Sequence, residues 1–287
     1  MDKITMIFKP QLFLKILIMF ASTMALGIFT AYKYSSFSSV IPISNFKFSY
    51  ADIVSAGLIF LFFIFAFKYK KAAHWFFRLF LVVIVFGGAQ FVFGAFDFAR
   101  MAYYSWDFIL TILILILFIS IKNVFMHNVG VILGIAGIGA LAGLSVSPTI
   151  AVFFLVALSF YDILAVYKTK HMIELAKNML ESGAAFGFLI PSGFKGFFSN
   201  KKEAHARAGD QFMILGSGDT AVPLILASSL VKTSLTQAVI VGLFSVAGLF
   251  ATHLIFVNQK KRAPMAALPP IATLSIIGYL TAIFLSG

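Results

Sequence analysis

The chain has 287 residues, of which 61% are hydrophobic and 11% charged, and it contains 36 Phe and no Cys. Soluble domains are about half apolar and a quarter charged, so the composition excludes a soluble globular protein and indicates a polytopic membrane protein. The missing cysteines exclude disulfides and thiolate metal sites. The net charge of +12 comes from basic residues that flank apolar segments, so no nucleic-acid partner is predicted.

Nine apolar segments follow one another along the chain. Most of them approach the roughly 20 residues that a helix needs to cross a bilayer. Helix is the expected form because backbone polar groups in lipid must be satisfied within the segment. The fold predicted is therefore an all-α membrane protein with nine transmembrane helices. The segments are 12–32, 51–67, 79–98, 103–121, 129–147, 149–167, 212–230, 235–257 and 268–285.

The positions of Lys and Arg test this topology. With alternating connections, 17 of the 22 basic residues fall on the side of the N-terminal tail and only four on the other side, while Lys15 lies inside the first segment. Basic residues gather on the cytoplasmic side of membrane proteins. The bias predicts a cytoplasmic N-terminus and an extracytoplasmic C-terminus, and it favours an odd number of spans.

The chain reads as one polytopic membrane domain, 1–287, without an internal repeat. Spans one to six occupy 1–167, a long cytoplasmic loop occupies 168–211, and spans seven to nine occupy 212–287. The loop is expected to begin with an amphipathic helix over 171–180. A Gly-rich apolar stretch, 183–198, follows; it is broken by Pro191 and is too short for a span. The connection at 122–128 between spans four and five is short.

Two acidic residues lie well inside predicted spans, Asp162 in the sixth and Asp219 in the seventh. A carboxylate in a bilayer costs several kcal/mol unless it is paired or used, so both are candidate functional groups. Asp162 lies about five residues before the cytoplasmic end of its helix, and Asp219 about seven residues after the start of the next. At ~1.5 Å per residue these are depths of roughly 7 and 10 Å from the same face, so antiparallel neighbours would place the carboxylates at one level.

Two carboxylates at one level can form an acid–base pair that shares a proton. One carboxylate then activates a water molecule, and the other protonates a leaving nitrogen. This chemistry hydrolyses an amide without a metal or cofactor, provided that the site opens to a polar cavity near the cytoplasmic face. The histidines are scattered along the sequence, with only His253 inside a predicted span, so no metal site is expected.

Residues around the two acids favour close approach of another backbone. Gly216 and Gly218 remove side chains before Asp219, and Pro223 four residues later should bend the helix at the acid. The ninth segment opens with Ala266-Ala267-Leu268-Pro269-Pro270. Consecutive prolines mark a helix start. A plain N-terminal turn and a partly unwound start that faces the active cavity are both open from composition.

Tyr161-Asp162 on the sixth span, Gly216-x-Gly218-Asp219 on the seventh and the Ala-Leu-Pro turn at the ninth resemble the presenilin and signal peptide peptidase family of intramembrane aspartyl proteases. The resemblance covers essentially the whole chain and is greatest to microbial (archaeal) presenilin homologues. It implies that Asp162 and Asp219 are the catalytic pair. It also implies that Tyr161, Gly216, Gly218, Ala267, Leu268 and Pro269 bind substrate or shape the site. Ala266 stands where the family motif has a proline.

The function implied is an aspartic endopeptidase that hydrolyses peptide bonds in transmembrane helices, as a multi-pass protein of the cell membrane. Its expected partners are the lipid bilayer and transmembrane-helix substrates, and a homo-oligomer remains an option. The main alternative is a proton- or cation-coupled transporter that uses the same carboxylates. Such transporters often show related halves, which are not seen here. A prepilin peptidase also uses Gly-x-Gly-Asp, but the Tyr-Asp span and the ninth-span turn argue against it.

Overall fold

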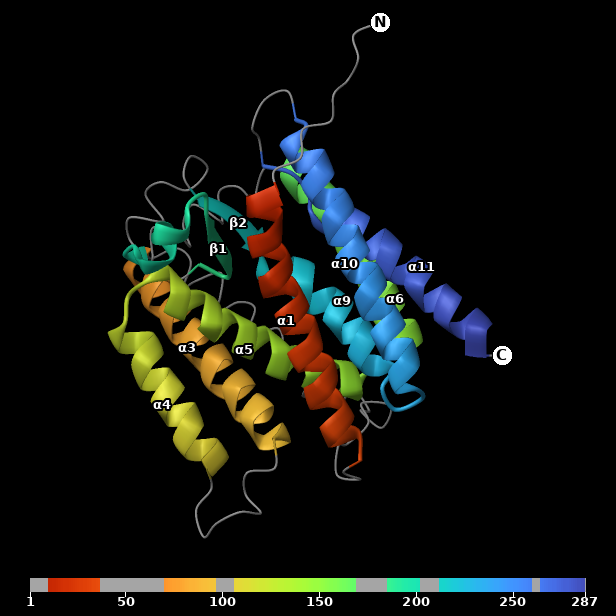
Figure 1. Cartoon of the computed structure of the whole chain (residues 1–287), viewed down its shortest axis with the longest axis horizontal. Coiled ribbons are helices and arrows are strands. Elements are labelled where there is room, and N and C mark those ends of the chain that lie inside the picture. The colour runs from red at the N-terminus through yellow and green to blue at the C-terminus, as the bar shows by residue number, and fades with distance from the viewer. Residues whose placement is uncertain are drawn as a thin grey trace, which may run out of the picture.

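The computed structural model describes residues 10–36, 70–96, 106–168, 185–201, 212–259 and 264–286, and most of them are helical. Figure 1 shows α3, α4 and α5 on one side and α6, α10 and α11 on the other, with α1 and α9 between them. The helices are α1 Pro10–Ser35, α3 Lys70–Ala95, α4 Trp106–Ser120, α5 Val124–Ser145, α6 Pro148–Ile163, α9 Ser217–Ser229, α10 Leu235–Val257 and α11 Leu268–Ser286.

Six of the described helices are long and apolar enough to cross a membrane: α1, α3, α5, α6 with its extension, α10 and α11. Helix α4 has 15 residues, which give about 22 Å of length, less than the ~30 Å of a hydrocarbon core. The predicted second span, 51–67, and the amphipathic helix at 171–180 lie outside the described residues. The structure therefore establishes a mostly helical protein with several spans, while the number nine stays a prediction.

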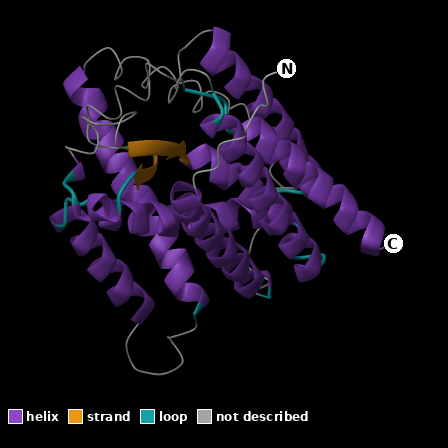
Figure 2. Cartoon of the chain, turned by 45° about the horizontal axis from the view of Figure 1, so that its top comes forward, coloured by secondary structure: helices purple, strands orange, loops and turns teal. Residues whose placement is uncertain are grey.

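The prediction for the seventh span is wrong at its start. Phe212–Gly216 is a β-strand, β2, which pairs antiparallel with β1, Gly187–Pro191, from the Gly-rich stretch of the loop. The helix α9 begins only at Ser217 and has 13 residues. A short apolar run suits a strand as well as a helix, and here β1 supplies the backbone partners that a helix would otherwise provide. Figure 2 shows this small sheet set against the helices.

The connection predicted at 122–128 is also shorter than expected. Asn123 caps α5 because its side chain accepts a hydrogen bond from the Met126 amide at 2.8 Å. Helix α5 therefore begins at Val124, and His127 and Asn128 are buried inside it. The prediction that only His253 among the histidines lies within a span is corrected by this result.

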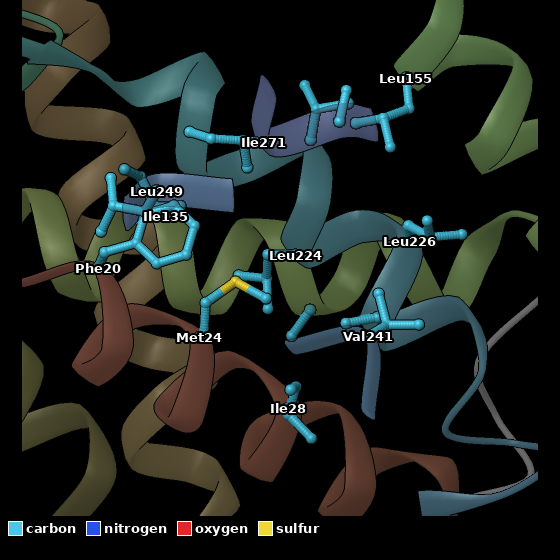
Figure 3. Close-up of a cluster of buried hydrophobic side chains, with 14 of the residues drawn as sticks. Phe20, Met24, Ile28, Ile135, Leu155, Leu224, Leu226, Val241, Leu249 and Ile271 are labelled. Atoms are coloured by element: carbon cyan, nitrogen blue, oxygen red, sulfur yellow. The ribbon is translucent and has the colours of Figure 1, made fainter. Parts of the chain in front are cut away.

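The core is built around α9, which contacts α1, α5, α6, α10 and α11. Figure 3 shows Leu224 of α9 among side chains from several of these helices. Leu224 is fully buried and fits against two glycines, Gly27 of α1 and Gly139 of α5, where an added Cβ would lie 2.5 and 2.8 Å from it. Small residues allow membrane helices to approach closely. The helix that carries Asp219 is thereby held from several sides.

The packing of α3 on α5 depends on backbone-to-backbone contact. A Cβ added at Gly137 would collide with the backbone of Gly88, and one added at Gly88 would collide with the backbone of Gly134. The Gln90 side chain of α3 donates to Asp107 of α4 at 2.7 Å, which joins the next helix to the pair. These contacts fix α3, α4 and α5 as one group beside α9.

Candidate active site

Asp162 lies in the last turn of α6, which continues directly into a π-helical turn, Leu164–Lys168. Short π-helical segments are frequent at functional sites. The Asp162 side chain is half-buried. Its Oδ2 accepts a hydrogen bond from the Leu268 amide at 3.3 Å, across 106 residues of sequence. One carboxylate oxygen of Asp162 is thus held by the start of α11.

Asp219 lies in the first turn of α9, three residues after the end of β2. The prediction that it sits about seven residues into a helix is corrected by this position. The N-terminal end of a helix favours a negative charge, because its free amides and its dipole point toward it. The Asp219 side chain is half-buried, and its Oδ2 lies 3.1 Å from where a Cβ on Gly216 would be. The glycine at 216 therefore leaves the space that this carboxylate occupies.

Asp162 ends α6 and Asp219 begins α9, and these two helices pack against one another. Helix α11 packs against both. Asp162 is thus at the end of one helix and Asp219 at the start of the other, which suits an antiparallel pair. Two carboxyl groups are the chemical types that can supply an acid and a base to one reacting group.

The start of α11 forms the third wall of the site. Residues 264–267 are not helical, and α11 begins at Leu268, with Pro269 and Pro270 in its first turn. The Leu268 amide, which has no partner in its own helix at this position, is the group that donates to Asp162. The structure thus gives the free amide of this turn a direct contact with the site.

Helix α10 contacts the residues at the start of α11 and holds them in place. The Thr252 hydroxyl donates to the Ala267 carbonyl at 3.3 Å, as well as to the Gly248 carbonyl at 2.9 Å. A Cβ at Gly248 would lie only 2.6 Å from the Ile271 Cα, so the two backbones touch at this point. Ala266, the residue that departs from the family motif, is buried with 5% exposure. The position of Leu268 is therefore set by α10.

Two of the predicted site-shaping residues have little contact with the described part of the chain. Tyr161 is 51% exposed, and within the described ranges no interaction joins it to either carboxylate. An added Cβ at Gly218 would meet no described atom within 4 Å, and the residue is exposed. The backbone neighbour expected at Gly218 is thus not seen among the described residues. Pro223 lies inside α9.

Sequence reasoning missed Thr252, which carries no charge and sits in an apolar segment like many others. It also left Asn128 in a connection, although a buried Asn128 binds β1 at both the Leu189 amide and carbonyl. Lys15 did stand out as a charge within a span. A charge at such a position needs a partner, but the sequence did not identify that partner, which is the end of β1.

An apolar cavity of about 160 Å³ lies between α3, α5 and α9 and reaches Ser217 and Gly187, next to the sheet and the start of α9. Its lining is almost wholly aliphatic, and includes Ile135 and Ile225. Such a lining suits a hydrophobic side chain. In the part of the chain that the structure describes, no group of three His, Cys, Asp or Glu lies together as a metal-binding cluster.

Residues 15–287 match the family model described as signal-peptide peptidase, presenilin aspartyl protease. A presenilin family intramembrane aspartate protease solved in space group C222 is similar at 22% identity and TM-score 0.62, over 95% of this chain and 99% of that chain. A structure of such a protease in space group P2 gives 22% identity and TM-score 0.50, over 92% and 96%. At these identities the likeness shows the fold. No curated protein matches the chain significantly.

Proposed function

Because the chain belongs to the signal-peptide peptidase and presenilin aspartyl protease family, we propose that Asp162 and Asp219 form its catalytic pair. Family membership makes the protein a membrane-embedded aspartic endopeptidase that acts on transmembrane substrates within the bilayer. The comparisons give no support to the alternative of a proton- or cation-coupled transporter. The observation that carries the residue assignment is that two half-buried carboxylates lie at the end of α6 and the start of α9, two helices that pack against one another.

In the proposed reaction the pair shares one proton, and a water molecule sits between the carboxylates and the scissile carbonyl. The ionised carboxylate takes a proton from the water, and the oxygen of that water bonds to the carbonyl carbon. The protonated carboxyl gives its proton to the carbonyl oxygen, which yields a gem-diol. The carboxyl that took the proton from water then protonates the amide nitrogen, while the other, now ionised, carboxylate takes a proton from a gem-diol hydroxyl. The C–N bond breaks, a new carboxyl and a new amine leave, and the pair again holds one proton.

The backbone around the pair supports this chemistry by holding the acids in place. The Leu268 amide holds Oδ2 of Asp162 at 3.3 Å, and the α9 N-terminus favours negative charge on Asp219. These fixed groups reduce the reorganisation needed when charge moves during the reaction. They also explain why α11 must begin at Leu268, because a helical turn before it would use this amide within the helix.

A transmembrane substrate must unwind before its backbone can reach the carboxylates, since a helix buries its carbonyls in its own hydrogen bonds. Strand β2 ends three residues before Asp219. An extended substrate segment that adds to β2 would have its backbone hydrogen bonds satisfied and would lead to the catalytic pair. The nearby apolar cavity would accept one of its side chains.

The finer features of the protein are part of the same proposal. We expect a single catalytic domain with nine spans, a cytoplasmic N-terminus and an extracytoplasmic C-terminus, inserted in the cell membrane. The six candidate spans and the 17-to-four distribution of basic residues support this arrangement. Tyr161, Gly218 and Pro269 are proposed to contact substrate rather than the pair itself. Homo-oligomerisation is compatible with this site, which is formed within one chain.

The test is cleavage of a labelled transmembrane-helix substrate by purified protein in detergent or vesicles. Asp162→Asn and Asp219→Asn should each lower kcat/KM by roughly 10²–10⁴-fold or more, because each removes an acid or base. Asp107→Asn is the matched control: it removes a membrane acid from α4, and the amide oxygen still accepts from Gln90. Wild-type cleavage by both single variants would refute the assignment.

A further inference from the structure

Within the described residues, side chains occupy one edge of the sheet, at β1, and no strand pairs with the other edge, at β2. The Ser217 amide donates to the Phe186 carbonyl at 3.2 Å, and Phe188 lies opposite Leu215, so even-numbered residues of this segment turn their backbone groups to β2. In a strand, successive residues alternate between edges. Gly187, Leu189 and Pro191 therefore direct their backbone groups to the outer edge of β1, away from β2.

Side chains from α5 occupy this outer edge. Asn128 donates from Nδ2 to the Leu189 carbonyl at 2.8 Å and accepts at Oδ1 from the Leu189 amide at 2.9 Å. These two bonds are the pair that a third strand would make with Leu189. The neighbouring His127 lies with Nε2 at 3.1 Å from the Gly187 carbonyl, and because a carbonyl only accepts, Nε2 is the donor.

A side chain from α1 completes the edge. Lys15 donates from Nζ to the Pro191 carbonyl at 2.9 Å and to the Ser192 carbonyl at 2.8 Å, and it lies 4.7 Å from the Phe194 ring centroid. Lys15 is only 3% exposed. A buried ammonium in a membrane helix is costly unless such partners stabilise it. Three side chains from two helices thus bind alternate residues of one strand.

Burial of apolar side chains does not by itself specify the register of β1. Phe188, Leu189 and Ile190 are all fully buried, so β1 has apolar contacts on both faces. Register is weakly specified in a strand whose two faces are alike, because a slip exchanges one apolar side chain for another. The two bonds of Asn128, in contrast, fit only where an amide and a carbonyl of the same residue face α5.

We propose that Asn128, together with Lys15 and His127, is a positioning clamp that holds β1 in one register and thereby determines which substrate peptide bond reaches the catalytic pair. The clamp fixes β1 against α1 and α5, β1 fixes β2, and β2 leads into the turn that carries Asp219. The clamp also closes one edge of the sheet, so an extended peptide can add only at β2. This role rests on the proposed function, since it requires a substrate strand beside β2.

The experiment combines hydrogen exchange with mass spectrometry of the cleavage products. Asn128→Leu removes both bonds to Leu189, and Lys15→Met, which keeps most of the side-chain stem, is the second variant in case the first does not fold. Asn123→Ala is the matched control, because it removes the α5 cap and leaves the bonds to β1 intact. Each protein is tested for exchange at residues 186–191, for thermal stability and for the termini of its products.

The Leu189 amide should exchange roughly tenfold faster in Asn128→Leu than in the wild type, because its side-chain partner is lost. The share of the main cleavage position should fall at least about twofold, with neighbouring bonds gaining, while Asn123→Ala keeps the wild-type pattern at a comparable loss of thermal stability. An unchanged pattern in Asn128→Leu and Lys15→Met, or the same change in Asn123→Ala, overturns the proposal. If the wild type cleaves no transmembrane substrate, the proposed function fails and the positioning role falls with it, while the exchange data still report whether the clamp exists.

Discussion

Gly216→Ala is the change that tests most closely how the carboxylate of Asp219 is placed. Gly216 has φ −61° and ψ 145°, a backbone conformation that alanine adopts without strain. The added methyl group would lie 3.1 Å from Oδ2 of Asp219. This distance is 0.3 Å shorter than 3.4 Å, the lower limit of an ordinary van der Waals contact. The perturbation is therefore steric and is directed at one oxygen of the proposed catalytic pair.

The size of the effect follows from this overlap. A misplacement of about 1 Å at a reacting group costs roughly 100-fold in rate, so a displacement of a few tenths of an ångström predicts a loss of about three- to tenfold. The loss should appear mainly in kcat, because the added methyl group meets Asp219 while alanine keeps the backbone groups of β2 that a substrate strand would bind. Thermal stability should fall little, since Asp219 can rotate away from the methyl group.

The assay is steady-state cleavage of a transmembrane-helix substrate, with kcat and KM determined separately. Gly193→Ala is the matched control in the same part of the chain, because its added Cβ meets no described atom within 4 Å and its φ of −107° suits alanine. Wild-type kcat in Gly216→Ala would refute the view that this glycine leaves space that Oδ2 of Asp219 needs for catalysis. A change in KM alone would place Gly216 against the substrate instead.

Two further predictions concern the helices behind the site. Thr252→Val should lower kcat by about two- to tenfold, the equivalent of one hydrogen bond, because the Ala267 carbonyl loses its donor, and Thr252→Ser should restore activity. Gly137→Ala should lower the free energy of unfolding by about 1–3 kcal/mol, because the added methyl group collides with the backbone of Gly88. Gly87→Ala, whose Cβ would make an ordinary contact at 3.5 Å, should be neutral in the same denaturation experiment; equal stability of both variants would contradict the packing described for α3 and α5.

Much of the helical framework could be predicted because apolar length is a direct physical requirement of the bilayer. The eighth predicted span, 235–257, has the same bounds as α10. The strand at 212–216 could not be predicted in the same way. Its residues are as apolar as those of a helix, and only its pairing with β1, more than 20 residues earlier, distinguishes the two forms.

Some residues of the candidate site could likewise be predicted from the sequence, and others could not. Asp162 and Asp219 were identifiable because an acid in a membrane segment is conspicuous in any sequence. The Leu268 amide is a backbone group, and its role depends on where a helix starts relative to another chain segment. Thr252 and Asn128 are polar residues of common types, and their partners are backbone atoms distant in sequence. Long-range contacts of this kind leave no local pattern.

The central claim is that Asp162 and Asp219 act together on one peptide bond. It is tested most directly by an experimental structure of the protein bound to a transmembrane-helix peptide that carries a hydroxyl group in place of the scissile carbonyl. We predict that this hydroxyl lies within about 2.6–3.2 Å of a carboxylate oxygen of both residues. A peptide that inhibits cleavage competitively while its hydroxyl group contacts neither carboxylate would contradict the claim.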